Sequence, residues 1–206
     1  MITIVDYGLG NVGSVANMFA KIGARAKIVN DAKALGAAEA LVLPGVGHFD
    51  AGMRLLREGG FVDALGELVV AKKTPILGIC LGMQLFSRRS EEGGGEGLGW
   101  LAADTKRIVA PPGVRLVIPH MGWSPTQGTD PALFGEFHEV PRFYYVHSFH
   151  VVCDDPRDVA ATCHYGVDLC AAVHKGNVYG TQFHPEKSHR FGMTLLRSFV
   201  AAVRSR

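Results

Sequence analysis

The sequence predicts an α/β fold in which a parallel central sheet has helices on both faces and antiparallel strands added beside it. In the first half, short β-branched runs alternate with helical patterns, and strands that alternate with helices favour a parallel sheet. After residue 100 the runs become short, β-branched and aromatic, which is typical of antiparallel strands. Because 206 residues is the length of one ordinary domain, we expect residues 1–206 to form a single domain.

The elements expected in the first half follow from hydrophobic periodicity and from the turn residues at their ends. Apolar runs of strand length occupy residues 2–5, 26–29, 40–43 and 75–79. Pro44 and Gly45 close the third of these strands. Helical spacing of apolar residues predicts helices over residues 11–20, 49–57 and 61–72, and a further helix that begins at Leu81 directly after the fourth strand.

The second half begins with residues 91–99, which are too rich in glycine for a regular element and predict an exposed loop. Strands are expected beyond it over residues 107–109, 115–118, 142–152, 169–173 and 177–182. Apolar side chains then recur at helical spacing from Phe191 to Val203. We therefore expect a final helix over residues 189–203 that closes the fold.

Charge and hydropathy exclude several classes of protein. The 21 basic and 19 acidic residues are interspersed and leave a net charge of +2, which argues against nucleic acid as the main partner. No run approaches the roughly 18 apolar residues that a membrane span needs, and residues 1–6 lack the basic flank of a secretion signal. The four cysteines have no CxxC spacing, so neither a zinc cage nor a dense disulfide framework is expected. These features predict a cytoplasmic protein.

A glycine, cysteine and glycine pattern lies where the fourth strand meets the next helix. Gly78, Cys80 and Gly82 form a GxCxG motif in the context of the GxSxG nucleophile elbow. The glycines permit a sharp turn that presents the thiol at the carboxyl edge of the sheet, and the N–H of Leu81 then points to where an oxyanion would form. By itself the motif also fits a buried cysteine in a strand-to-helix turn.

His184 and Glu186 are the candidates for the base and for the group that orients it. A thiolate nucleophile needs a proton carrier, and His184 ends a predicted strand in the segment QFHPEK. Pro185 stiffens this segment, while Glu186 can curl back to hydrogen-bond the imidazole and fix its tautomer. Together with Cys80, these residues predict a Cys-His-Glu triad.

Two motifs and four supporting blocks of the chain resemble the class I glutamine amidotransferases. The motifs are GICLGMQ at residues 78–84 and QFHPEKS at residues 182–188. The blocks follow the family's order: DYGLGN at 6–11, PGVGHF at 44–49, PHMGW at 119–123 and YYVHSF at 144–149. Met83 stands where other branches usually carry histidine, so the chain is most similar to the branch that works with a cyclase in histidine biosynthesis.

This resemblance implies a flavodoxin-like domain that hydrolyses glutamine to glutamate and ammonia through a cysteinyl thioester. It implies no metal and no organic cofactor. It places the oxyanion hole at Gly47 and Leu81 and the contacts to the substrate at Gln84, Ser148 and Phe149.

The resemblance also implies a partner, because ammonia must reach an acceptor before water protonates it. The implied partner is a cyclase subunit of (β/α)8 barrel fold, which forms a heterodimer with the glutaminase. It uses ammonia to make imidazole glycerol phosphate and an aminoimidazole carboxamide ribotide. The interface candidates are Asn11, Trp123 and Lys187.

A competing interpretation is a dinucleotide-binding protein. Gly8, Gly10 and Gly13 form a GxGxxG directly after the first strand, and Asp31 lies near the end of the second, as in the dinucleotide fingerprint. This interpretation ranks lower because it leaves the triad unexplained. Three further alternatives are a thiol hydrolase of γ-glutamyl compounds, an interaction subunit with an inactive site, and a glutaminase that serves another ammonia acceptor.

Overall fold

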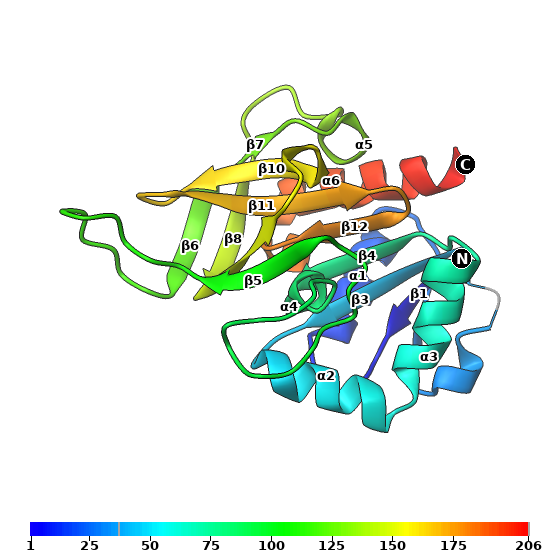
Figure 1. The fold of residues 1–206 in the computed structure, drawn as a ribbon. Coiled ribbons are helices and arrows are strands. Elements are labelled where there is room, and N and C mark those ends of the chain that lie inside the picture. The colour runs from blue at the N-terminus through cyan, green and yellow to red at the C-terminus, as the bar shows by residue number, and fades with distance from the viewer. Residues whose placement is uncertain (37, 206) are drawn as a thin grey trace.

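The predicted parallel sheet forms the centre of the computed structural model, which describes residues 1–36 and 38–205 (Figure 1). Within the described residues, one sheet of eight strands has the order β2-β1-β3-β4-β12-β11-β10-β7. Its parallel part consists of β1 (Ile2–Val5), β2 (Ala26–Val29), β3 (Ala40–Gly45), β4 (Ile76–Cys80) and β12 (Val178–Thr181). Its antiparallel part adds β11 (Asp168–Lys175), β10 (Val159–His164) and β7 (Gln127–Gly128).

The four strands expected in the first half are confirmed, whereas several expectations about the second half are wrong. Residues 177–182 were expected among the antiparallel strands, but β12 runs parallel to β4. The reason is the tight turn at Gly176, which makes β12 antiparallel to β11. Because β11 itself runs against the core strands, β12 returns in their direction and brings its carboxyl end beside that of β4.

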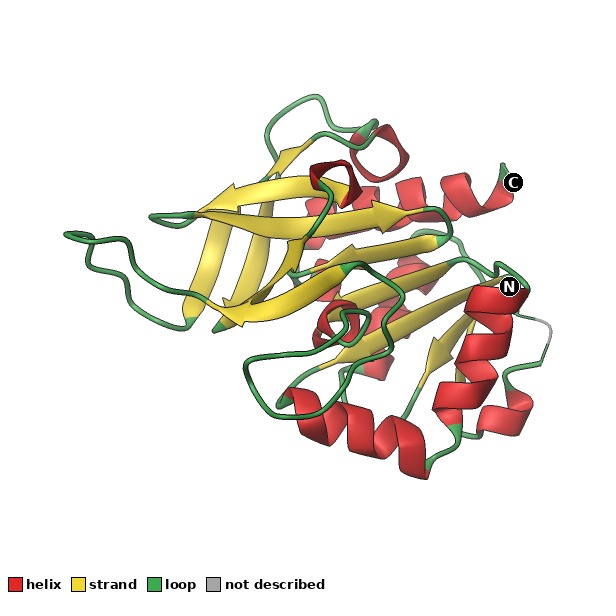
Figure 2. Cartoon of the chain, viewed as in Figure 1, coloured by secondary structure: helices red, strands yellow, loops and turns green. Residues whose placement is uncertain are grey.

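Helices cover both faces of the sheet, as the sequence predicts (Figure 2). One face packs against α1 (Val12–Lys21), α5 (Pro131–Phe134) and α6 (His189–Arg204). The other packs against α2 (Phe49–Glu58), α3 (Phe61–Gly66) and η2 (Glu67–Ala71), together with the short helix α4 (Leu81–Gln84). The helix expected over residues 61–72 thus changes to π-helical hydrogen bonding at Glu67. Shorter 3-10 turns are η1 (Ala32–Ala34), η3 (Pro156–Asp158) and η4 (Pro185–Lys187).

The second half contains strands that the sequence did not reveal. Two pairs of strands lie outside the large sheet: β5 (Ala103–Arg107) with β9 (Phe149–Cys153), and β6 (His120–Pro125) with β8 (Arg142–His147). The single strand expected over 142–152 is therefore divided at Ser148, because β8 and β9 pair with different partners. The sequence did not predict β6, β7 or β10, and of β5 it predicted only Arg107.

Residues 108–119 contain no strand, so the strands expected over 107–109 and 115–118 are wrong except at Arg107. This segment projects away from the sheets (Figure 1), where no neighbouring strand is present to pair with it. The loop over residues 91–99 is confirmed as irregular; the backbone N–H groups of Gly94 and Gly95 bind the carboxylate of Asp50 there. No helix in the described part of the chain is both long and apolar enough to span a membrane.

Candidate active site

Cys80 occupies a sharp and strained turn between β4 and α4. Its backbone has φ 54° and ψ −109°, a region that residues with a side chain rarely adopt. The turn depends on its glycines: a Cβ on Gly82 would lie 1.8 Å from the carbonyl oxygen of Leu43, and one on Gly78 would lie 2.6 Å from the backbone nitrogen of Met83. The predicted elbow therefore forms because neither Gly78 nor Gly82 has a side chain, which lets neighbouring backbone segments approach this closely.

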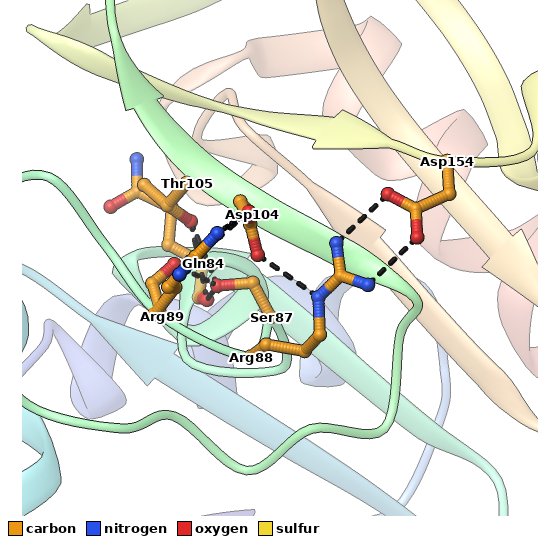
Figure 3. A network of polar contacts seen from close by, with 7 residues as sticks. All are labelled: Gln84, Ser87, Arg88, Arg89, Asp104, Thr105 and Asp154. Carbon is orange, nitrogen blue, oxygen red and sulfur yellow. Dashed lines mark hydrogen bonds and ion pairs between the residues drawn. The ribbon is translucent and has the colours of Figure 1, made fainter.

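The helix after the elbow is only one turn long and is anchored at its far end. It ends at Gln84, whose carbonyl oxygen accepts hydrogen bonds from the hydroxyls of Ser87 at 2.7 Å and Thr105 at 3.4 Å (Figure 3). Next to them, Arg88 forms ion pairs with Asp104 and Asp154. This network joins the segment after Cys80 to β5 and holds the backbone of Gln84 in place.

His184 and Glu186 form the pair that the sequence predicts. The ring nitrogen Nδ1 of His184 donates to the Glu186 carboxylate at 2.7 Å, and the two side chains are 1% and 3% exposed. Nδ1 therefore carries a proton, which leaves Nε2 to interact with Cys80. Among the described residues, Nε2 has no hydrogen bond of regular geometry. Burial lowers the pKa of His184, but its interactions with Cys80 and Glu186 outweigh burial and raise this pKa to about 9.

The backbone around His184 is fixed from two sides. Its N–H donates to the carbonyl of Tyr144 in β8 at 2.9 Å. Its own carbonyl accepts from the hydroxyl of Ser188 at 2.6 Å, and that hydroxyl also accepts from the N–H of Tyr144 at 3.0 Å. Ser188 thus ties the segment that carries His184 to β8 and fixes the backbone from which the imidazole projects.

A cavity of about 490 Å³ opens at this edge of the sheet. Seven of the predicted residues line it: Gly47, Cys80, Leu81, Gln84, Ser148, Phe149 and His184. Glu186 lies behind His184 and outside the cavity wall, as expected for a residue that orients the base. Within the described residues, no group of three or more His, Cys, Asp and Glu side chains is placed to hold a metal ion.

Gly47, an expected residue of the oxyanion hole, has a backbone conformation that favours glycine. Its φ is +98°, and no atom lies within 4 Å of where a Cβ would stand. Glycine is therefore required here by backbone conformation and not by crowding. Gly47 follows β3, whose last residue Gly45 pairs with Cys80, so the loop that carries Gly47 lies beside Cys80.

Gln182 belongs to the site although its role could not be deduced from the sequence. Its side-chain Nε2 lies 3.6 Å from the sulfur of Cys80, and its Oε1 accepts from Nε2 of Gln84 at 3.0 Å. Gln84 Nε2 also donates to the carbonyl of Phe149 at 3.0 Å. The sequence feature that could have pointed to Gln182 is its position two residues before His184 in the motif QFHPEKS.

A pair of neutral histidines supports the same carbonyl. His147 Nδ1 lies 2.8 Å from the carbonyl oxygen of Phe149, which can only accept, so this nitrogen carries the proton. His147 Nε2 then accepts from His120 Nδ1 at 3.0 Å, and His120 Nε2 accepts from the hydroxyl of Ser124 at 2.8 Å. Burial lowers the pKa of His147 to about 3 and that of His120 to about 4, so both rings stay neutral.

Two of the three interface candidates lie on one surface. The ring of Trp123 stacks on His189 at 5.3 Å between centroids and meets Tyr144 edge-on at 6.1 Å. The ammonium group of Lys187 lies 5.6 Å from the centre of the same Tyr144 ring. Asn11 is the N-cap of α1 and accepts from the N–H of Ser14 at 3.1 Å, so it has a structural task in the free chain.

The glycines of the dinucleotide fingerprint have other tasks. A Cβ on Gly10 would lie 3.0 Å from that of Pro44, so this glycine lets the first loop pack on β3. Gly13 has no atom within 4 Å of its Cβ position, whereas the third glycine of the fingerprint serves close packing of helix and strand. The carboxylate of Asp31 caps η1 through the N–H of Lys33. This geometry gives the dinucleotide interpretation no support.

Comparison with known proteins identifies the family. The model of the family "Glutamine amidotransferase class-I" matches residues 3–203. Imidazole glycerol phosphate synthase subunit HisH 2 of Pseudomonas aeruginosa is 48% identical over 98% of this chain and 100% of its own length. The HisH 2 protein of Methanococcus maripaludis is 48% identical over 97% of this chain and 98% of its own.

Solved structures share the fold at much lower identity. A crystal structure of a glutamine amidotransferase has a TM-score of 0.76 and 20% identity, and covers 98% of each chain. The structure of PurLQS from Thermotoga maritima has a TM-score of 0.72 and 18% identity, and covers 97% of each chain. The sequence matches and the shared fold together show that this chain belongs to the class I glutamine amidotransferase family, on the HisH branch of imidazole glycerol phosphate synthase subunits.

Proposed function

We propose that Cys80, His184 and Glu186 are the catalytic triad with which this glutaminase releases ammonia from glutamine for a cyclase subunit. The observation that supports this most directly is the geometry at the carboxyl edge of the sheet. A thiol on a strained elbow faces a buried imidazole whose other nitrogen is bound to a carboxylate at 2.7 Å. Both the thiol and the imidazole line a cavity of about 490 Å³, large enough to take up an amino acid.

The first half of the reaction forms the thioester. The sulfur of Cys80 attacks the amide carbon, and the oxyanion that develops accepts from the N–H groups of Gly47 and Leu81. The carbon–nitrogen bond then breaks as Nε2 of His184 gives its proton to the departing ammonia. Glu186 contributes by holding Nδ1–H, so the imidazole always presents Nε2 to the reacting atoms.

The second half restores the enzyme. Nε2 of His184 now accepts a proton from water, and the oxygen attacks the thioester carbon. The carbon–sulfur bond breaks, glutamate forms, and the sulfur leaves as a thiolate. Gln84, Ser148 and Phe149 hold the substrate at the cavity wall throughout, which is consistent with their places in the structure. The chain needs no cofactor for either step, because covalent catalysis divides the reaction between groups that it carries itself.

Ammonia is useful only if it stays unprotonated until it meets its acceptor. We therefore propose a heterodimer with a (β/α)8 cyclase that makes imidazole glycerol phosphate and an aminoimidazole carboxamide ribotide. The surface of Trp123, Tyr144 and Lys187, with Asn11, is the proposed docking site. The whole of residues 1–206 serves as the glutaminase domain, and its proposed location is the cytoplasm.

The test of the triad is Cys80→Ala in the complex. Synthesis that depends on glutamine should be abolished, because the variant has no nucleophile, while synthesis from added ammonium salt at high pH should persist. Product formation from each nitrogen source is measured under the same conditions. Retained turnover with glutamine would contradict the assignment of the nucleophile, and loss of synthesis from both nitrogen sources would point to a defect in assembly.

A further inference from the structure

We infer that Gln182 is a positioning residue for the nucleophile, whose side-chain N–H donates to the sulfur of Cys80 and stabilises its thiolate form. This inference rests on Cys80 acting as the nucleophile. Gln182 lies outside the Cys-His-Glu triad and carries no group that titrates. It therefore offers the sulfur the same hydrogen bond at every pH at which the enzyme is folded.

The sheet places Gln182 beside Cys80. Residues of β12 pair in parallel with β4, up to Thr181 opposite Ile79. Continuing that register by one residue puts Gln182 level with Cys80. The residue is fully buried, and its backbone N–H donates to the carbonyl of Ala171 in β11 at 2.8 Å. Its side chain therefore starts from a fixed point next to the elbow.

A chain of hydrogen bonds determines which end of the Gln182 amide faces the sulfur. The carbonyl of Phe149 can only accept, so the NH₂ group of Gln84, 3.0 Å away, must face it. The same NH₂ group lies 3.0 Å from Gln182, so the oxygen of Gln182 must face Gln84. The remaining end is the NH₂ group of Gln182, at 3.6 Å from Cys80 Sγ. A flipped amide would set two donors against each other.

The alternative is that Gln182 merely satisfies Gln84 in a buried place. That explanation accounts for its oxygen but leaves its NH₂ group to be explained, since buried donors are nearly always paired. Among the described residues, the sulfur of Cys80 accepts a hydrogen bond from Gln182 Nε2. A hydrogen bond to a charged group is stronger than one to a neutral group, so this contact favours the thiolate over the thiol.

The consequence for the reaction concerns two moments at which the sulfur carries charge. One is the attack on the amide, when the thiolate must be available. The other is the breakdown of the thioester, when the carbon–sulfur bond breaks and the electron pair returns to sulfur. A donor fixed at the sulfur lowers the cost of both moments without moving a proton itself.

The experiment measures the thiolate directly, without turnover. The full chain is treated with iodoacetamide from pH 5 to 10, and the alkylation rate of the Cys80 peptide is followed by mass spectrometry, which separates it from the other cysteines. The variants are Gln182→Met and Gln182→Leu, which fill the space without an N–H donor. Asn177→Leu is the matched control, because Asn177 is a buried amide that donates to the carbonyls of Val69 and Thr74, away from the cavity.

We expect both Gln182 variants to raise the midpoint of the pH profile and to slow alkylation at pH 7 about tenfold or more, with an unchanged plateau at high pH. Asn177→Leu should lower the melting temperature and leave the midpoint in place. Because two Gln182 variants are used, the test can still be carried out if one of them fails to fold. A wild-type midpoint in a folded Gln182 variant would overturn the inference. Alkylation of wild-type Cys80 that leaves turnover with glutamine intact would instead refute the proposed nucleophile.

Discussion

His184 holds its proton more firmly than a histidine in water. Burial acts against the charged ring, but Cys80 and Glu186 outweigh it and raise the pKa from 6.5 to about 9. At neutral pH the ring is thus protonated, and in the proposed reaction it gives Nε2–H to departing ammonia. The same residue must later accept a proton from water, so its value to the enzyme depends on its protonation changing within one cycle.

His184→Asn should lower the rate with glutamine by about a hundredfold or more, because the variant cannot shuttle a proton. The ammonia-dependent rate of the complex is the control and should be unchanged. A fall no larger than the change in melting temperature explains would show that this histidine is structural.

The same variant tests the raised pKa through the free energy of unfolding. Because the folded pKa of about 9 exceeds the ordinary 6.5, protonation of His184 stabilises the folded chain. This contribution is fully present below about pH 6.5 and is lost as the pH rises through about 9. The free energy of unfolding of the wild type relative to His184→Asn, measured by denaturation at each pH, should therefore decrease as the pH rises between these values. A difference that does not vary with pH would contradict the assignment.

At the scale of elements, the β4 elbow requires glycine for steric reasons that the α1 helix does not share. Gly82→Ala would bring its Cβ to 1.8 Å from the Leu43 carbonyl oxygen, whereas Gly13→Ala meets nothing within 4 Å. We expect Gly82→Ala to cost about 3 kcal/mol or more of the free energy of unfolding, since backbone atoms must move. Gly13→Ala, near the start of α1, should be neutral or stabilise by up to about 1 kcal/mol.

Chemical denaturation of both glycine variants measures these values. Activity gives a second readout, because Gly82→Ala displaces Cys80 and Gly13→Ala leaves the cavity untouched. Equal effects of the two substitutions on stability would mean that the elbow is more adaptable than its close contacts indicate. Loss of turnover in Gly13→Ala would revive a functional role for the first glycine loop.

The loop from β3 to α2 is the expected gate of the site. We predict that the isolated chain hydrolyses glutamine only slowly and that a docked partner with its ligand turns the peptide between Val46 and Gly47 toward the oxyanion. Gly47→Ala should restrict this motion, because its φ of +98° strains any residue with a Cβ. We expect turnover with glutamine to drop about a hundred- to a thousandfold.

Ammonia-dependent synthesis and complex formation are the controls for Gly47→Ala, and both should persist. Open space around the Cβ position means that crowding cannot explain a loss. Stimulation of this variant by the acceptor ligand to the wild-type rate, or full activity of the isolated wild-type chain, would show that the gate lies elsewhere.

At the scale of the whole molecule, the surface of Trp123, Tyr144 and Lys187 lies beside the segment of His184 and is the proposed docking site. Trp123 is 40% exposed and Met121, two residues before it in β6, is 62% exposed. Trp123→Ala should weaken binding of the cyclase by about tenfold or more, because aromatic residues often dominate the binding energy of interfaces. Val70→Ala, an exposed apolar side chain on η2, is the matched control and should bind normally. Titration calorimetry measures both, and equal affinities would place the interface on another face.

The sequence alone determined the parallel core and the helices on its faces, and it led to the proposed triad. Strands β1 to β4 are mostly apolar and α1, α2 and α6 have clear helical spacing, so each could be located without its neighbours. The turn at Cys80 and the contact between His184 and Glu186 could be predicted because the elbow glycines and the His-Pro-Glu segment constrain the backbone locally. The residues that shape the backbone of these segments lie within a few positions of Cys80 and His184 in the sequence.

Only the tertiary structure decided the second half and the support of the site. The division of residues 142–152 at Ser148 depends on which strands are available for pairing, and β12 takes its direction from the turn before it. The contact of Gln182 with Cys80 joins residues that are 102 positions apart. Such contacts are properties of strand order and register, which no local sequence pattern encodes. For this reason Gln182 could be recognised as part of the site only in the folded chain, although it lies two residues before His184.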